Sequence, residues 1–486
     1  MKRLLPALLA LLMILSTACA GGTEPADTTA APDAAVTTAA PETDPPETEL
    51  APVIPDVKYD GHTVQYLTVT DYSKHFRLTA EADGETLNEA GYKRNMAVSE
   101  LLGVNFAVTE VEAAKVSTTL SNDISANTNS FDFVLPHASN GVSAMVAGNM
   151  FYNLKDVPTL DFSMPWWNGA MTDALSIKGK TFLASGDFFI SWQGMNAIIF
   201  NKNYIKDLGI TEDLYQTARD GKWTYAKMME YASKVSADLN GDGQMTEVDR
   251  YGYLGNKNTG YNTVISQDQP LTTRNADGMI VLAMDTERMI SIVEKYYELV
   301  NAPYSYMDVY GSTTYATSVY RSILVEGRSF FTELDIGGLY SNLREIEFNF
   351  GILPMPKFDE SQEQYKVFCG AGLLGIPVNT PAENLARSGA VAEALAYYSY
   401  KFMRPAFFDI VLESKSVRDE DSYEMIRLLH EGKTFDIGYN MGSGDIYNIL
   451  KKVVIDNNSS NFTSIYKTME KVQNKTLEKL YNSIND

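Results

Sequence analysis

Three observations predict an α/β fold for this chain. Short apolar runs of strand length recur along it, and between them lie stretches with apolar residues at helical spacing. Strands that alternate with helices are typical of parallel sheets covered by helices on both faces. The size agrees, because 486 residues with 45% hydrophobic and 21% charged side chains allow two to three domains that each bury a core.

The expected elements follow from these periodicities in chain order. The strands are expected at 62–70, 104–111, 131–136, 180–185, 195–201, 329–333, 348–354 and 367–377. The helices are expected at 88–102, 224–236, 287–300, 391–403, 421–430 and 464–484. No clean linker interrupts residues 57–486, so any two domains are expected to be interleaved in sequence.

Charge and aromatic content argue against some functions and favour others. The net charge is −22, from 40 basic and 62 acidic groups, and an acidic protein is a poor partner for a phosphate backbone. We therefore expect no nucleic-acid partner. Twenty-nine Tyr and 21 Phe against four His favour an aromatic binding surface over acid–base or metal chemistry.

The N-terminal residues have the features of a targeting signal. Residues 1–19 begin with two basic residues, continue with an apolar run to Leu15 and end in small residues before Cys19, which predicts a secretory signal too short to span a membrane. A Cys directly after small residues resembles the bacterial lipobox, although Ser16 stands where Leu is usual. The resemblance implies cleavage before Cys19, lipidation of its thiol and anchoring at the outer face of the cell membrane. The alternative is plain secretion.

Residues 20–56 are predicted to be a disordered tether. They are rich in Thr, Ala and Pro and carry acidic groups but no basic ones, a composition that cannot bury enough apolar area to fold. The only other cysteine, Cys369, lies in the apolar run CGAGLLGIPV. We expect it to be a buried small hydrophobe, so the folded part has no disulfide.

Several phrases resemble the carbohydrate-type (family 1) extracellular solute-binding proteins of bacterial ABC importers, of the Gram-positive lipoprotein type. These phrases are AIIFNKNYIKDLGI (197–210), DGKWTYAKMMEYASKV (220–235), DLNGDGQMTEVDRYGY (238–253), FNFGILPMPKFDESQEQY (348–365), a helix after GIPVNT (375–380) and KSVRDEDSYEMIRLLHEGKTFDIGY (415–439). The resemblance implies a type II periplasmic-binding-protein-like fold, with two α/β lobes joined by crossing hinge strands. It implies lobe one at 57–194 plus 355–403, and lobe two at 195–347 plus 404–486.

The crossing strands also fit the residues themselves. The apolar run 195–201 reads as a strand that leaves lobe one for lobe two, and 348–356 reads as the return. Pro354 and Pro356 would end ladder pairing just after the crossing, because proline has no N–H to donate.

One loop has the spacing of a calcium site. Residues that can ligate calcium stand at positions 1, 3, 5, 7 and 12 of a twelve-residue EF-hand-like loop. Gly243 at position 6 allows the sharp turn, and Asp stands in place of the usual final Glu. The predicted ligands of a structural calcium ion are Asp238, Asn240, Asp242, Gln244 and Asp249. The alternative is an acidic surface turn, in which such residues are common.

Sugars have apolar ring faces and hydroxyl edges, so a site for them needs aromatic platforms flanked by carboxylates and amides. In α/β folds such residues gather beyond the carboxyl ends of the strands. This rule selects Asp71, Tyr72, His137, Asn140, Asp187, Trp192, Gln193, Asn196, Glu333 and Asp335, with Trp166 as a further candidate platform. Trp192 is the leading candidate, and its alternative role is packing at the hinge.

The resemblance implies a monomeric receptor, not an enzyme. It captures a sugar or oligosaccharide and delivers it to ABC permease subunits. No GxSxG, Walker A or HExxH motif argues otherwise. Two alternatives stay open, namely a surface-anchored carbohydrate-binding protein or adhesin without a transport role, and a receptor for a peptide or another non-sugar ligand.

Overall fold

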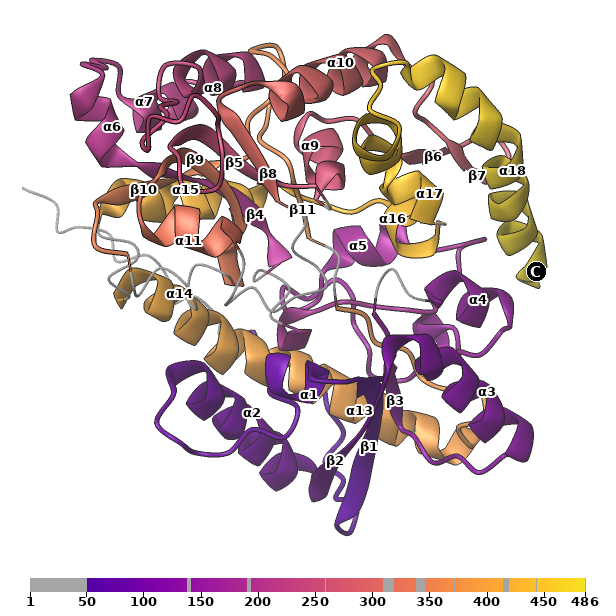
Figure 1. Cartoon of the computed structure of the whole chain (residues 1–486). Helices are drawn as coiled ribbons and strands as arrows, with labels where there is room; N and C mark the ends of the chain where they lie inside the picture. The colour runs from indigo at the N-terminus through magenta and orange to yellow at the C-terminus, as the bar shows by residue number, and fades with distance from the viewer. Residues whose placement is uncertain are drawn as a thin grey trace, which may run out of the picture. The chain divides into compact units, whose positions relative to one another are not determined.

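The structure is a computed structural model that describes residues 50–137, 141–189, 194–257, 259–308, 319–337, 346–369, 372–413, 419–442 and 444–485 (Figure 1). The predictions for Cys19 and for the tether residues 20–49 therefore lie outside the described residues. No helix in the described part is both long and apolar enough to cross a membrane.

The first lobe is built on a three-stranded parallel sheet in the order β2-β1-β3. β1 (His62–Val69) lies in the middle, between β2 (Val104–Val111) and β3 (Phe133–Leu135). Because side chains alternate between the faces of a strand, Val64 and Tyr66 enter one apolar cluster and Leu67 and Val69 enter another. A central strand covered on both faces explains why the second half of this run, Tyr66–Val69, is buried at every position.

Helices cover this sheet. α2 (Thr86–Leu102) packs against α13 (Ala382–Tyr398), which returns to the first lobe from far along the chain. α3 (Val116–Ala126) contacts β1 and α4 (Val142–Ala147). The shorter helices of this lobe are α1 (Tyr72–His75) and α5 (Gly169–Ala174).

The second lobe is built on a five-stranded mixed sheet in the order β10-β4-β9-β5-β8. Its strands are β4 (Asn196–Asn201), β5 (Tyr251–Asn256), β8 (Ser305–Asp308), β9 (Ser329–Asp335) and β10 (Phe350–Pro354). β4 runs antiparallel to both of its neighbours, β9 and β10. The two predicted crossing strands are thus adjacent, and Pro354 sits on the edge strand β10, where a missing N–H costs no ladder bond.

The remaining elements pack around the second sheet or, as α14 and α18 do, reach elements of the first lobe. The helices are α6 (Lys202–Asp207), α7 (Leu214–Arg219), α8 (Tyr225–Ala232), α9 (Gly260–Ser266), α10 (Glu287–Asn301), α11 (Val319–Val325), α14 (Arg404–Glu413), α15 (Glu420–Glu431), α16 (Ile437–Met441), α17 (Gly444–Tyr447) and α18 (Phe462–Ser483). Two short ribbons pair β6 (Thr272–Arg274) with β7 (Ile280–Leu282), and β11 (Val367–Phe368) with β12 (Lys433–Thr434).

Two expected strands are largely absent. Residues 180–185 form only isolated bridges, such as Ala184 to Leu374, and among the described residues of the expected strand 367–377 only β11 is a strand. Gly372 and Gly375 approach the rings of Phe189 and Phe151 so closely that an added Cβ would lie 2.4 and 2.6 Å from ring carbons. The segment therefore threads through the core beside aromatic rings instead of extending a ladder.

The helix expected at 391–403 begins earlier and changes geometry at its end. α13 starts at Ala382, and a π-helical turn over Ser399–Met403 leads directly into α14. Pro405 in the first turn of α14 cannot donate to a carbonyl four residues back, which accounts for the altered hydrogen-bond register before it.

Candidate functional site

Two predicted residues of the first lobe meet beyond the strand ends. Tyr72 follows β1 and His137 follows β3, and their ring centroids lie 5.9 Å apart. Asp71, beside Tyr72, is exposed and holds a left-handed backbone conformation with φ 70°. Burial lowers the pKa of His137, so its imidazole is neutral at pH 7. This edge offers an aromatic ring, a neutral imidazole and a carboxylate.

Three predicted residues of the second lobe lie at the corresponding ends of its central strands. Glu333 and Asp335 end β9, and Asn196 begins β4 directly opposite Asp335 in the antiparallel register. Asn196 is 7% exposed and Glu333 4%. Because β4 runs the other way, its first residue reaches the same edge as the last residues of β9.

Glu333 is a buried carboxyl group held by neutral donors. The Tyr253 hydroxyl donates to it at 3.0 Å and the Asn262 side-chain amide at 3.3 Å. Burial raises the pKa of Glu333 to about 7, and these donors only partly oppose the shift. Asn262 belongs to α9, so Glu333 ties the end of β9 to that helix.

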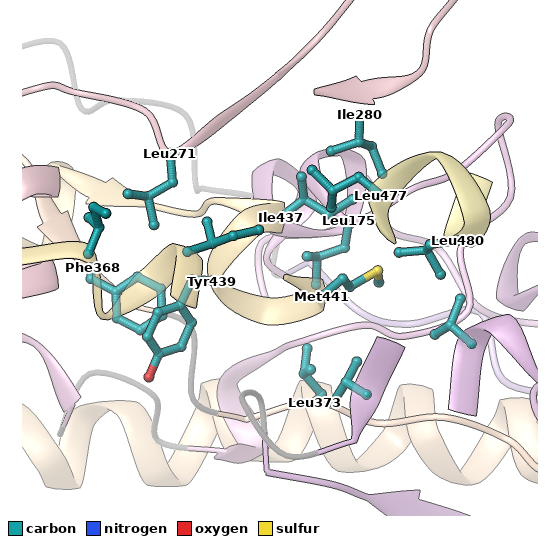
Figure 2. Close-up of a cluster of buried hydrophobic side chains, with 14 of the residues drawn as sticks. Leu175, Leu271, Ile280, Phe368, Leu373, Ile437, Tyr439, Met441, Leu477 and Leu480 are labelled. Carbon is teal, nitrogen blue, oxygen red and sulfur yellow. The ribbon is translucent and has the colours of Figure 1, made fainter. Parts of the chain in front are cut away.

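An aromatic cluster lies beside these residues and was missed by the sequence analysis. Tyr439 of α16 has its ring centroid 3.9 Å from Phe368, 5.0 Å from Tyr261 of α9 and 5.1 Å from Tyr447 of α17. Figure 2 shows Phe368 and Tyr439 side by side. Burial raises the pKa of Tyr72, and Tyr439 raises it further, so the rings of the two lobes lie within electrostatic range.

One signal could have revealed part of this cluster. Tyr261 follows the carboxyl end of β5, the position at which the strand-end rule looks for ligand contacts. The strand itself was overlooked because Gly252 and Gly255 interrupt its apolar pattern. No local pattern marks Phe368 or Tyr439, since only packing brings them together.

Asp187 lies in a charged cluster that draws on both lobes. It is 7% exposed, and its carboxylate Oδ2 is 3.6 Å from Nε of Arg404 in α14. Burial raises the pKa of Asp187 to about 7, while Arg404 and Lys433 of β12 oppose that shift. Lys433 and Arg404 also reach Nε2 of His430, at 2.9 and 3.3 Å. Burial, with Lys433 and Arg404, lowers the pKa of His430 to about 3, which leaves the imidazole neutral.

The structure corrects the expectation for Trp166. Its side chain is 0% exposed, and its indole N–H donates to Glu393 at 2.6 Å, while Trp167 donates to the other carboxylate oxygen at 2.8 Å. A buried indole needs such a partner, and the Glu393 carboxylate on α13 provides it for both. Trp166 is therefore a core residue and offers no face to a ligand. Cys369 is buried as expected, and Trp223 is buried too.

Three predicted contacts, Trp192, Gln193 and Asn140, lie outside the described residues.

The calcium-like loop is stabilised by its own polar groups. Asp238 accepts the backbone N–H groups of Gly241 and Gly243, both at 2.7 Å, and Asp242 accepts that of Gln244 at 2.8 Å. Asp249 accepts backbone N–H groups from Thr246 at 2.7 Å and Leu239 at 2.8 Å, and these bonds lower its pKa. Within the described residues, no three or more His, Cys, Asp or Glu side chains are gathered to hold a metal ion.

The sequence matches no family model and no curated protein. Its fold, however, matches solved structures. An ABC substrate-binding protein from Listeria monocytogenes in complex with cycloalternan aligns with a TM-score of 0.56 and 12% identity, over 86% of this chain and 100% of that chain. The cyclic alpha-maltosyl-1,6-maltose binding protein from Arthrobacter globiformis gives 0.53 and 13%, over 87% and 98%.

A third structure has a ligand of another kind. UgpB from Mycobacterium tuberculosis in complex with glycerophosphocholine aligns with a TM-score of 0.54 and 11% identity, over 86% of this chain and 99% of that chain. At these identities the likeness shows the fold alone. That fold is α/β and periplasmic-binding-protein-like, which confirms the predicted fold class.

Proposed function

We propose that this protein is an extracellular solute-binding protein of an ABC importer, which captures a sugar or oligosaccharide between its lobes and delivers it to permease subunits. It acts as a monomeric receptor without catalysis. The ligand binds to one lobe, and the other lobe closes over it and adds contacts that exist only in the closed state.

One observation carries this proposal. Aromatic rings come from both lobes: Tyr72 follows β1 in the first, Tyr261 and Tyr439 pack together in the second, and Tyr439 lies within electrostatic range of Tyr72. Carboxylate and amide groups, including Asp335 and Asn196, lie at the same edge. Ring faces that stack on sugar rings and oxygens that accept from hydroxyls are the two elements a sugar site needs.

The solved structures with a similar fold also support a sugar ligand. Two of the structures reported above are named with cyclic glucans or maltosyl sugars, and the third with glycerophosphocholine. A sugar is therefore the favoured ligand class, and a non-sugar solute is the second candidate, favoured by the charged cluster of Asp187, Arg404 and Lys433.

The test is a thermal-shift screen of residues 51–486, which form one unit by their contacts, against a panel of linear and cyclic glycans. A ligand that binds only the native state raises the free energy of unfolding by about 2.7 kcal/mol at one hundred times its Kd, and the melting temperature rises with it. A selective shift with one glycan family supports transport of that family, provided that the glycan is recovered intact. No shift with any glycan, and a shift with glycerophosphodiesters or peptides, would replace the sugar proposal.

Aromatic contacts give a sharper prediction. We expect Tyr72→Ala and Trp192→Ala each to weaken glycan binding by at least about tenfold, because each removes a stacking surface worth roughly a kcal/mol or more. Tyr92→Ala on the outer face of α2, where Tyr92 is 36% exposed, is the matched control. Calorimetry measures the affinity of each variant. If Tyr72→Ala and Trp192→Ala bind glycan as tightly as the wild type and the control do, neither residue belongs to the site.

We further propose a structural calcium ion in the 238–249 loop. Its support is the ligand spacing and the left-handed turn at Gly243, with φ 79°. Ion binding would gather Asp238, Asp242 and Asp249 around the metal. We expect 10 mM calcium to stabilise the wild type by roughly 1–3 kcal/mol for a Kd near 10⁻⁴–10⁻³ M, but not the Asp242→Ala variant. Asp277→Asn is the control, and equal melting temperatures in calcium and chelator would refute the ion.

The location is also part of the proposal. Cleavage before Cys19 and lipidation of its thiol would anchor the chain at the outer face of the membrane, with residues 20–56 as the tether. Tethering keeps the receptor near its permease and raises its effective concentration there. Metabolic labelling with a fatty-acid analogue, lost in Cys19→Ser, checks this assignment.

A further inference from the structure

A buried apolar seam joins the two lobes, and it belongs to the same apolar cluster as Phe368 and Tyr439 of the candidate site. Leu175 and Leu373 come from the first lobe, and Met441 and Leu477 from the second, and all are at most 1% exposed. Figure 2 shows these side chains facing one another. They belong to a single apolar cluster, which also holds Leu67 of β1 and Ile292 of α10. Separating the lobes here would expose these side chains to water, which is unfavourable.

The C-terminal helix α18 is an element of the second lobe that takes part in this contact. It packs on β7 of its own lobe and on α4 of the other. The last carbonyls of a helix have no partner within the helix, and they carry its negative dipole end. In this structure, side chains of the first lobe bind the carbonyl of the last helical residue, Ser483, and those of the two residues that follow it.

Three donors of the first lobe bind the end of α18. Lys178 donates to the carbonyl of Ile484 at 2.9 Å, Lys180 to that of Asn485 at 2.8 Å, and Asn149 to that of Ser483 at 3.3 Å. The Lys178 ammonium also lies 5.2 Å from the ring centre of Tyr481. Positive charge near a helix C-terminus is favourable, because the negative end of the helix dipole lies there.

The turn that presents these lysines is strained. Ile177 and Lys180 exchange two backbone hydrogen bonds of 2.9 Å across a two-residue turn, and both central residues have positive φ, 50° at Lys178 and 74° at Gly179. Such turns favour Asn, Asp or Gly at both central positions, and a lysine with positive φ is unfavourable. The strained conformation directs Lys178 at α18.

The contact is reciprocal. Arg274 of β6 in the second lobe donates to the carbonyl of Ala174 at 3.1 Å and to that of Ser176. These carbonyls lie at the C-terminal end of α5 in the first lobe. Each lobe therefore supplies cationic side chains to a chain segment of the other, and both sets of contacts involve the stretch from Ala174 to Lys180.

We propose that these contacts form a latch that stabilises the closed state. The latch consists of the apolar seam, the end of α18 held by Lys178 and Lys180, and the end of α5 held by Arg274. It sets how often the lobes open in the absence of ligand. The proposal deepens the closure step of the proposed function, and it applies whichever solute the cleft accepts.

The test measures the distance between the lobes without any ligand. Spin labels are placed on the full chain at Met96→Cys of α2 and Leu239→Cys of the second lobe, which are 50% and 53% exposed, in a Cys19→Ser background. Cys369 is 1% exposed and does not compete for the label. The polar variant is Lys178→Met with Arg274→Met, and the apolar variant is Leu480→Ala. The control is Lys475→Met, an exposed lysine on the same helix.

We expect a short distance in the wild type and in the control, and at least a tenfold rise in the ratio of long to short distances in the polar variant. Circular dichroism verifies that each variant is folded, and the polar variant decides the matter if Leu480→Ala does not fold. Identical distances in the polar variant and the control overturn the latch, as does a wild type that is already open. Because no ligand is added, this outcome is independent of the glycan screen.

Discussion

At the residue scale, two buried carboxyl groups organise the lobes. Glu393 accepts both indole N–H groups of Trp166 and Trp167, and Glu333 accepts from Tyr253 and Asn262. They are 1% and 4% exposed, and burial raises the pKa of both. A carboxyl group so buried is stable only where several donors converge on it. Each one fixes elements that lie far apart in the sequence.

Glu333 gives a pH prediction. Its folded-state pKa is about 7, above the value of 4.5 that applies in the unfolded chain, so the folded state binds more protons between these pH values. Stability attributable to this group is therefore full below pH 4.5 and falls as the pH rises to 7, by on the order of 3 kcal/mol. We expect the stability of the wild type relative to Glu333→Gln to fall by this amount between pH 4.5 and 7.5.

Urea unfolding of both proteins at several pH values measures that difference. Asp285→Asn, a change outside the site, controls for general pH effects. A difference between the wild type and Glu333→Gln that does not vary with pH would contradict the assignment.

At the element scale, close backbone contacts decide which strands form the centre of a sheet. β5 lies between β9 and β8, and its Gly252 faces the end of α8. An added Cβ at Gly252 would lie 1.8 Å from the carbonyl oxygen of Ala232. Glycine here allows α8 to pack directly on the strand. It also interrupts the apolar pattern by which the strand would be predicted from the sequence.

We expect Gly252→Ala to destabilise the protein by roughly 1–3 kcal/mol, because α8 must move away from β5 to admit the methyl group. Thermal unfolding of the variant measures the loss. Ala237→Gly, just beyond α8, gives the background for a change of one methyl group near the same helix. A Gly252→Ala protein as stable as the wild type would show that the packing of α8 on β5 is looser than described.

At the scale of the whole molecule, one apolar cluster draws side chains from both lobes. Leu67 of β1 and Leu477 of α18 belong to it, although they lie in different lobes and at opposite ends of the described chain. Domains that share a core are expected to unfold together. The seam should therefore make the two lobes one cooperative unit.

We expect a single calorimetric transition whose van 't Hoff and calorimetric enthalpies agree. Leu477→Ala should lower stability by about 2–5 kcal/mol, since the side chain is 0% exposed, while Val472→Ala on the same helix, 61% exposed, should change it by less than about 0.5 kcal/mol. Two separate transitions in the wild type would show that the lobes fold independently of the seam.

Local patterns determined much of this protein. The strand expected at 104–111 matches β2, and the carboxyl-end rule brought Tyr72 and His137 to one place, because both depend on periodicity and chain direction. Tertiary structure alone decided that Trp166 is a core residue held by Glu393, that Tyr261, Phe368 and Tyr439 form one aromatic cluster, and that α18 reaches the first lobe. These are contacts between segments tens to hundreds of residues apart, and no local pattern encodes them, since burial and partner choice arise only when the segments pack.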